Sequence, residues 1–263
     1  SSENPSPSPP AASASAAAAA AAASTGRRQL SDYVPSADEL AASAAAARRF
    51  HVVVLGHVDA GKSTLMGRLL HATGAVSQRQ AHRNERDAAA AGKASFSWAW
   101  ALDERPEERE RGVTVDVAQA HLDTGRTSVT LLDAPGHRDF VPNAIAGAAQ
   151  ADAAVLVVDA APGGFESGFG SGGGGGGQTR EHVQLAKSLG VERLIVAVSK
   201  MDACGYSQSR FDEIKATLEP FLKTTGFRAD GAVRWVPVSG FEGANLVIPA
   251  APPPPQLSSW WNG

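Results

Sequence analysis

The stretch Gly56-His57-Val58-Asp59-Ala60-Gly61-Lys62-Ser63 fits the pattern G-x-x-x-x-G-K-[ST], in which the backbone N–H groups of a glycine-rich loop surround a di- or triphosphate. The apolar run Phe50–Leu55 precedes this loop, and leucines with a methionine follow it at helical spacing between residues 65 and 70. A strand, a glycine-rich turn and a helix in this order are the context in which the pattern binds phosphate. The sequence therefore predicts an α/β fold of the P-loop NTPase type.

The last two residues of this pattern have side chains suited to the charged groups of a nucleotide. We expect Lys62 to place its ammonium between the β- and γ-phosphates, and Ser63 to offer its hydroxyl to Mg²⁺. The helix that begins there points the positive end of its dipole at the phosphates. The predicted phosphate-binding residues are Asp59, Ala60, Gly61, Lys62, Ser63 and Thr64.

A second motif, Asp133-Ala134-Pro135-Gly136-His137, follows the apolar run Thr127–Leu132. Asp133 then stands at the end of a strand, where its carboxylate can support the same Mg²⁺ through a water. Gly136 has no side chain to keep its N–H from a γ-phosphate oxygen, so it can report whether that phosphate is present. His137 is expected to position the attacking water, and the alternative is a turn histidine with a structural hydrogen bond. The neighbouring motif residues favour the catalytic role.

A third motif, Ser199-Lys200-Met201-Asp202, ends the apolar run Arg193–Ser199. The Asp202 carboxylate can accept hydrogen bonds from N1–H and the exocyclic amine of guanine, which adenine cannot satisfy. Lys200 has an aliphatic stem that can lie over the base, and Ser239-Gly240 can supply a backbone N–H to guanine O6. Such a tetrapeptide alone is usually a solvated loop. Its position after the other two motifs predicts GTP and GDP as the ligands.

A further predicted ligand of Mg²⁺ lies between the first two motifs, in the run Arg111–Asp116. Thr114 is expected to complete the metal shell, together with Ser63 and Asp133, only while GTP is bound. Upstream of it, residues 77–109 are dense in charge, which is typical of a solvated helical hairpin. We expect this segment to order with GTP and to loosen after hydrolysis.

The chain divides into three parts by composition. Residues 1–48 are rich in Ala, Ser and Pro and predict a disordered segment, with a transit peptide as the less favoured alternative. Residues 49–248 alternate apolar runs with helical patterns, which predicts a mostly parallel sheet with helices on both faces. The remaining strands are expected at Ala153–Asp159 and Val233–Val238, with Val113–Leu122 pairing antiparallel at the edge. Residues 249–263 form a Pro-rich tail.

The bulk composition excludes several classes of function. A net charge of −3 over 263 residues gives no sign of a nucleic-acid or acidic membrane surface as a partner. No run approaches the roughly 18 apolar residues of a membrane span, so no membrane partner is predicted. The single cysteine, Cys204, rules out an intramolecular disulfide and fits a reducing compartment.

Residues 50–248 resemble the GTP-binding domain of the translational GTPases close to eukaryotic elongation factor 1-alpha. The matching strings are G-H-V-D-A-G-K-S-T, D-A-P-G-H-R-D-F, A-A-Q-A-D-A-A-V-L-V-V-D-A, G-Q-T-R-E-H and V-P-V-S-G-F-E-G-A-N-L. Within this group the chain is most similar to the Hbs-type ribosome-rescue GTPases that partner Pelota. The strings S-T-L-M-G, G-K-A-S-F and E-E-R-E-R-G-V-T-V-D-V carry that choice. Class-II release factors and tRNA-delivering elongation factors are the alternatives.

The resemblance implies a cytoplasmic, monomeric GTPase that delivers a partner to the ribosomal A site. The ribosome docks His137 onto the water in that family, and Val58 and Val113 match hydrophobic residues thought to gate it. The delivered partner would be a Pelota-like factor, or else a release factor or an aminoacyl-tRNA. A rival of another class is a module whose shape GTP maintains and whose hydrolysis is vestigial.

The chain departs from the family pattern in three places. Ser199 stands where the family has Asn, and its smaller side chain is expected to weaken nucleotide binding by about 1 kcal/mol per hydrogen bond lost. The run Gly172–Gly177 lengthens a loop that is shorter in the family, as a surface insertion would. Family members also carry two β-barrel domains after the GTP-binding domain, which grip the delivered partner.

Overall fold

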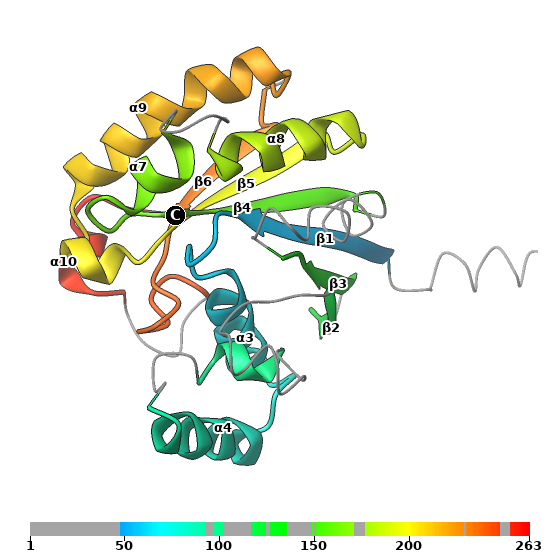
Figure 1. Cartoon of the computed structure of the whole chain (residues 1–263), viewed down its shortest axis with the longest axis vertical. Helices are drawn as coiled ribbons and strands as arrows, with labels where there is room; N and C mark the ends of the chain where they lie inside the picture. Colours follow the sequence, from blue (N-terminus) through cyan, green and yellow to red (C-terminus); the bar gives the residue numbers. More distant parts are fainter. Residues whose placement is uncertain are drawn as a thin grey trace, which may run out of the picture. The chain divides into compact units, whose positions relative to one another are not determined.

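The structure is a computed structural model, and it describes residues 48–92, 97–102, 117–124, 127–135, 149, 151–170, 177–228, 230–247 and 253–263. Among these residues the strands form one sheet in the order β2-β3-β1-β4-β5-β6 (Figure 1). All neighbouring strands are parallel except β2 and β3. The strands are β1 (Arg48–Gly56), β2 (Ala118–Asp123), β3 (Thr127–Asp133), β4 (Ala153–Asp159), β5 (Arg193–Ser199) and β6 (Val233–Pro237).

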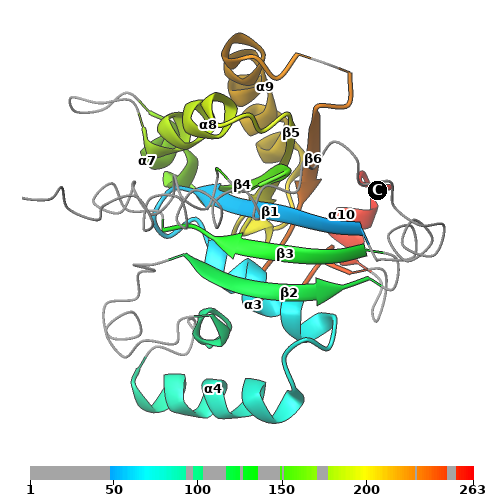
Figure 2. The same ribbon diagram turned by 90° about the vertical axis from the view of Figure 1, so that its right-hand side faces the viewer.

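Helices cover both faces of this sheet, as predicted. The helix α3 lies on one face, while α7, α8 and α9 lie on the other (Figure 2). The described helices are α3 (Lys62–Ala72), α4 (Gln78–Ala90), α7 (Gly164–Phe169), α8 (Gln178–Ser188), α9 (Gln208–Thr225) and α10 (Pro255–Ser258), with short 3₁₀ turns η3 (Ala99–Ala101) and η5 (Met201–Cys204).

The central strand β4 explains why the predicted strands read as unbroken apolar runs. Its Leu156 and Val158 are buried in the core beneath α8 and α9, together with Ile214. Val157 points to the opposite face and is buried with Met66 of α3. Because both faces of a strand are covered, every position is apolar and strict alternation disappears.

The edge strand confirms the antiparallel pairing expected of residues 113–122, within narrower limits. β2 pairs antiparallel with β3 and brings Leu122 opposite Val129. Alternate β2 residues are exposed, as expected of a strand with one face open to water. Residues 113–116 lie outside the described residues.

The segment 77–109 is predicted to be a solvated helical hairpin. Among its described residues, α4 is the one α-helix, and the short turn η3 follows it. Ser77 caps α4 by accepting a hydrogen bond from the Gln80 N–H at 3.3 Å. Most of its charged side chains are exposed. Residues 93–96 and 103–109 lie outside the described residues, so the second arm of the hairpin stays a prediction.

The C-terminal residues 253–263 fold back onto the domain. Leu257 of α10 is fully buried in the core on the α9 face. Trp260 and Trp261 pack against Phe211 of α9, with ring centroids 5.3 and 5.7 Å from it. The domain limits at residues 48 and 248 stay predictions, because 1–47 and 248–252 lie outside the described residues. No helix among the described residues is long and apolar enough to cross a membrane.

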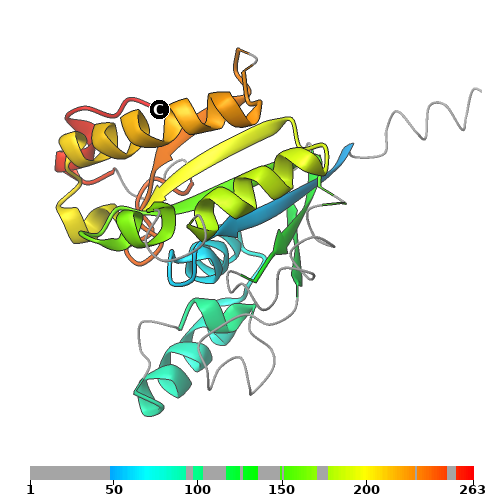
Figure 3. The ribbon, with the colours of Figure 1, turned by 45° about the horizontal axis from the view of Figure 1, so that its top comes forward.

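The parallel strands bring the first residues of the three motifs to one edge of the sheet (Figure 3). Gly56 ends β1, Asp133 ends β3 and Ser199 ends β5. The register sets Gly56 opposite Val157 and Ser199 opposite Asp159, so all these ends lie at the carboxyl edge. Ligands of open α/β sheets bind at this edge.

Candidate nucleotide-binding site

The predicted phosphate-binding loop joins β1 to α3. Two positions in it require glycine, each for a different structural reason. A Cβ atom on Gly56 would lie 2.3 Å from the Val157 carbonyl oxygen, so only glycine lets β1 approach β4 this closely. Gly61 has φ +91° in the left-handed region and directly precedes α3. The loop therefore delivers its backbone to the first turn of a helix, as an anion site requires.

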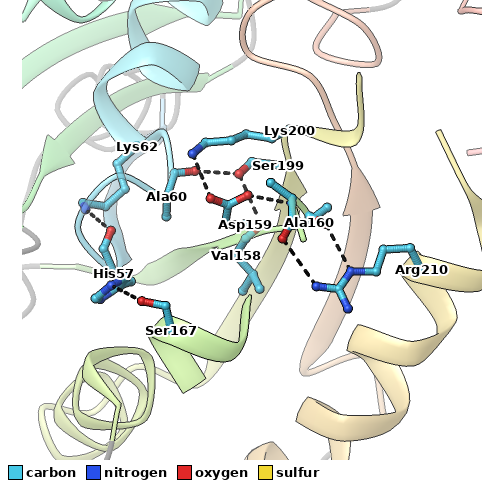
Figure 4. A network of polar contacts seen from close by, with 11 residues as sticks. His57, Ala60, Lys62, Val158, Asp159, Ala160, Ser167, Ser199, Lys200 and Arg210 are labelled. Atoms are coloured by element: carbon cyan, nitrogen blue, oxygen red, sulfur yellow. Dashed lines mark hydrogen bonds and ion pairs between the residues drawn. The ribbon is translucent and has the colours of Figure 1, made fainter. Parts of the chain in front are cut away.

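Lys62 folds back across the loop that carries it. Its Nζ donates to the carbonyl oxygen of His57 at 2.9 Å (Figure 4) and to that of Gly56 at 3.0 Å. The side chain is only 7% exposed, and this burial lowers its pKa, while the nearby Asp133 carboxylate opposes the shift. The structure thus places the cation at the centre of the loop.

Two of the predicted Mg²⁺ ligands meet directly, although 70 positions separate them. Ser63 Oγ, at the start of α3, donates to Asp133 Oδ2 at 2.6 Å. Asp133 is fully buried at the end of β3. A hydroxyl and a buried carboxylate are hard oxygen donors, the kind that Mg²⁺ prefers, so the residues present fit this ion.

Three predicted site residues cannot be placed. Thr114, Gly136 and His137 lie outside the described residues, so their roles stay predictions. The described part of the second motif is held against β1, because the Ala134 N–H donates to the Val54 carbonyl at 3.2 Å. The chain therefore leaves the sheet beside the phosphate-binding loop.

Ser199 bonds to the phosphate-binding loop even though it is smaller than the Asn of the family. Its Oγ lies 2.6 Å from the Ala60 carbonyl oxygen and 3.2 Å from that of Val158. A hydroxyl has one proton to donate, and the closer Ala60 carbonyl oxygen is the better acceptor for it. One brace between β5 and the loop is therefore retained.

Lys200 is anchored by a residue that the sequence did not single out. Its Nζ lies 2.8 Å from Asp159 Oδ2 at the end of β4. The other Asp159 oxygen accepts from the Ala161 N–H at 2.8 Å, so the carboxylate is fixed on both sides. The Lys200 stem passes Gly61, with Cε 3.9 Å from where a Cβ would stand. The only sequence signal for Asp159 was an acid at the end of an apolar strand.

Asp202 is the second residue of the turn η5, three positions after the end of β5. Its Oδ1 is buried and has no hydrogen-bond partner among the described residues. A buried carboxylate oxygen without a donor is costly and calls for a ligand or water to satisfy it. This atom belongs to the carboxylate that is predicted to accept from the guanine N1–H and amine.

The Ser239-Gly240 loop packs against the start of α3. A Cβ on Gly240 would lie 3.2 Å from the Leu65 Cα, so the two backbones are close. The Ser239 N–H donates to the Ala244 carbonyl at 3.2 Å. Of the two N–H groups in the motif, that of Gly240 is therefore the candidate donor to guanine O6.

A comparison with known protein families finds a match over most of the chain. The family described as "Elongation factor Tu GTP binding domain" matches residues 47–250. The chain belongs to this family. The predicted resemblance to its elongation factor 1-alpha-like members is confirmed.

Among relatives of the family, Protein HBS1 from Drosophila melanogaster is 54% identical over 213 residues, which are 81% of this chain and 31% of that protein. Elongation factor 1-alpha from Entamoeba histolytica is 45% identical over 213 residues, 81% of this chain and 46% of that protein. The chain thus spans less than half the length of each of these two relatives.

Solved structures give the same result for the fold. The crystal structure of sup35 complexed with GMPPNP is 32% identical, with a TM-score of 0.57, covering 82% of this chain and 42% of that one. The GTP-bound Ski7 GTPase-like domain of S. cerevisiae has a TM-score of 0.67 over 85% of this chain and 51% of that one. At 24% identity, the second likeness supports the fold alone.

In this family member two further residues support the site without having been singled out from the sequence. His182 of α8 is buried, and burial together with the charge of Lys62 lowers its pKa to about 4, so the imidazole is neutral at neutral pH. Arg210 of α9 donates to the Ala160 carbonyl at 3.1 Å (Figure 4) and pairs with Glu166 at 2.9 Å. It fixes the segment that follows Asp159.

Proposed function

We propose that this domain binds GTP and GDP at the carboxyl edge of its sheet, hydrolyses GTP, and serves in ribosome rescue. The observation that carries the rescue assignment is its identity of 54% to Protein HBS1, against 45% to an elongation factor 1-alpha over the same number of residues. Because the chain spans 31% of that relative, the activity of a whole rescue factor is part of the proposal.

The phosphate side of the site supports in-line attack of water on the γ-phosphate. The Lys62 ammonium, which lies over the loop, and backbone N–H groups of the loop would stabilise charge on the phosphate oxygens. Ser63 and Asp133 would hold Mg²⁺ together with Thr114, and this ion neutralises charge on the β- and γ-phosphates when bound. Gly136 would contact the γ-phosphate, and His137 would orient the water.

The base side of the site supports recognition of guanine. Asp202 supplies a buried carboxylate oxygen for the N1–H and amine groups. Lys200, fixed by Asp159, would lay its stem along the base, while Ser199 braces the loop below. The Gly240 N–H would approach O6. Adenine offers neither the donor pair nor the acceptor that these groups match.

The proposed partners are the ribosome and a Pelota-like factor. The protein itself is proposed to be cytoplasmic and monomeric. A release factor and an aminoacyl-tRNA remain alternative cargoes, because relatives of the elongation type are also similar over 81% of the chain. A module that binds GTP without hydrolysing it is the rival of a different class.

Equilibrium binding of fluorescent GDP, competed with GTP, ATP and XTP, tests the first part of the proposal. Displacement by GTP and not by ATP is expected. Adding ribosomes with a Pelota-like protein should then raise GTP turnover, and a release factor in its place should not. A chain that binds GTP but whose turnover never responds to ribosomes would be the non-hydrolysing module.

A further inference from the structure

Tyr206, which follows η5, holds an uncommon backbone conformation. Its φ is +56°, in the left-handed region that a bulky side chain rarely adopts. The residue is 6% exposed. Such a conformation persists only where the surroundings over-determine it. The contacts of Tyr206 therefore identify what the fold holds in place there.

Three polar contacts of Tyr206 reach three separate segments. Its N–H donates to the Met201 carbonyl at 2.8 Å, which closes the turn that contains Asp202. Its hydroxyl donates to Glu242 Oε2 at 2.6 Å. Its carbonyl accepts from Trp260 Nε1 at 2.9 Å, across 54 positions of sequence.

The first two contacts join the two loops proposed to read guanine. Met201 and Asp202 begin η5, on the N1–H side of the base. The Glu242 N–H donates in turn to Ser239 Oγ at 3.0 Å, on the O6 side. Tyr206 thus links these two loops, beside the direct bond from the Met201 N–H to the Val238 carbonyl at 3.2 Å.

The third contact ties this junction to the C-terminal residues 253–263. The anchor is firm, because Leu257 is fully buried and the Trp260 ring packs on Phe211. The Trp260 N–H and the Trp260 ring therefore do different things: the ring attaches the segment to α9, and the N–H holds the Tyr206 carbonyl.

We infer that Trp260 is a positioning residue for guanine recognition, acting through Tyr206 on the spacing between Asp202 and the Ser239 loop. The inference rests on the proposed role of Asp202. It makes the C-terminal segment a determinant of base selectivity and of GDP release, although its link to the site among the described residues is the bond from Trp260 to the Tyr206 carbonyl.

The full-length variant Trp260→Phe separates the two roles, since it keeps an aromatic ring and removes the N–H donor. Trp261→Phe is the matched control, because Trp261 also packs on Phe211 and the same atoms are lost. The measurement is the release rate of fluorescent GDP and of fluorescent IDP, whose base lacks the exocyclic amine. Thermal unfolding of each variant is recorded alongside.

Loss of one neutral hydrogen bond changes an equilibrium or rate constant by about fivefold. Trp260→Phe should therefore release GDP about fivefold faster than wild type. The release rate of IDP should change less, so the ratio of the IDP to the GDP release rate, which measures the preference for GDP over IDP, becomes smaller. Both release rates of Trp261→Phe should match those of wild type. Equal acceleration for both nucleotides, or unchanged GDP release in a folded Trp260→Phe protein, overturns the inference.

Tyr206→Phe provides a second variant if Trp260→Phe does not fold. It removes the hydroxyl that bonds Glu242 and leaves the Trp260 contact, so it should narrow the same preference; an unchanged preference overturns the inference as well. A wild-type chain that does not distinguish GDP from IDP contradicts the proposed role of Asp202 instead, which separates the two failures.

Discussion

Ser199 Oγ lies 2.6 Å from the Ala60 carbonyl oxygen, although 139 positions separate the two residues. The bond joins the end of β5, where the guanine motif begins, to the middle of the phosphate-binding loop. The base side and the phosphate side of the site are therefore coupled through one buried hydroxyl.

Ser199→Ala should weaken GDP binding. The change leaves the Ala60 carbonyl without this donor in a buried setting, which costs on the order of 1–3 kcal/mol, part of it in affinity. Equilibrium titration with fluorescent GDP measures the effect. Ser188→Ala is the control, because its hydroxyl bonds the Gln184 carbonyl on an exposed stretch of α8. Equal affinity in both variants would show that the brace does not matter for binding.

Asp202→Asn should move the base preference from guanine to xanthine. Xanthine carries a carbonyl where guanine has its amine, and the Asn amide can donate to it. We expect GDP affinity to fall by at least about 100-fold and XDP to become the better competitor, since sites built to hydrogen-bond a group reject analogues that lack it. Asp212→Asn, on the exposed side of α9, serves as the control. Continued preference for GDP in Asp202→Asn would refute the assignment.

His137→Ala should abolish ribosome-stimulated hydrolysis while GDP and GTP still bind. The side chain is proposed to orient water and to make no contact needed for affinity. Single-turnover phosphate release with and without ribosomes measures the loss, and fluorescent GDP titration checks binding. A variant that keeps full stimulation would assign the histidine to the turn.

His182 makes stability depend on pH in a defined window. Burial lowers its folded-state pKa to about 4, below the usual 6.5 of histidine, so between these values the unfolded chain binds the proton and the folded chain does not. Stability from this group is therefore complete above pH 6.5 and falls as the pH drops toward 4, by on the order of 3 kcal/mol.

Urea unfolding at pH 7 and pH 4.5 measures this loss. His182→Gln should show a smaller loss between the two pH values than wild type, because Gln does not titrate. His82→Gln changes a largely exposed histidine of α4 and should behave as wild type. A loss in His182→Gln as large as that of wild type would mean that other groups cause the acid sensitivity.

Much of the fold could be predicted from local patterns. The runs Thr127–Leu132 and Arg193–Ser199 became β3 and β5 because apolar residues on both faces leave few alternatives to a buried parallel strand. The end of α9 also has a local cause, since Gly226 takes φ +116° there. The structure brings Ser63 and Asp133, which belong to separate motifs, within 2.6 Å of each other, while the binding roles of Lys62 and Ser63 stay predictions.

The parts that could not be predicted depend on pairs of single residues far apart in sequence. Nothing periodic marks Asp159 as the partner of Lys200, and nothing links Trp260 to the Tyr206 carbonyl. Such pairs form only after the sheet has ordered its strands, so a reading along the chain does not reveal them. The partner of Ser199 could not be predicted for the same reason: its acceptor is the Ala60 carbonyl, a backbone atom without a sequence signature.

Gly56 has a consequence for how this protein can evolve. Any side chain at that position would collide with the Val157 carbonyl oxygen, so glycine is required there for β1 to pair with β4. Natural selection for folding alone would preserve it. A descendant that had lost all use for GTP would still carry the first glycine of the motif, and its presence in a decayed relative would say nothing about activity.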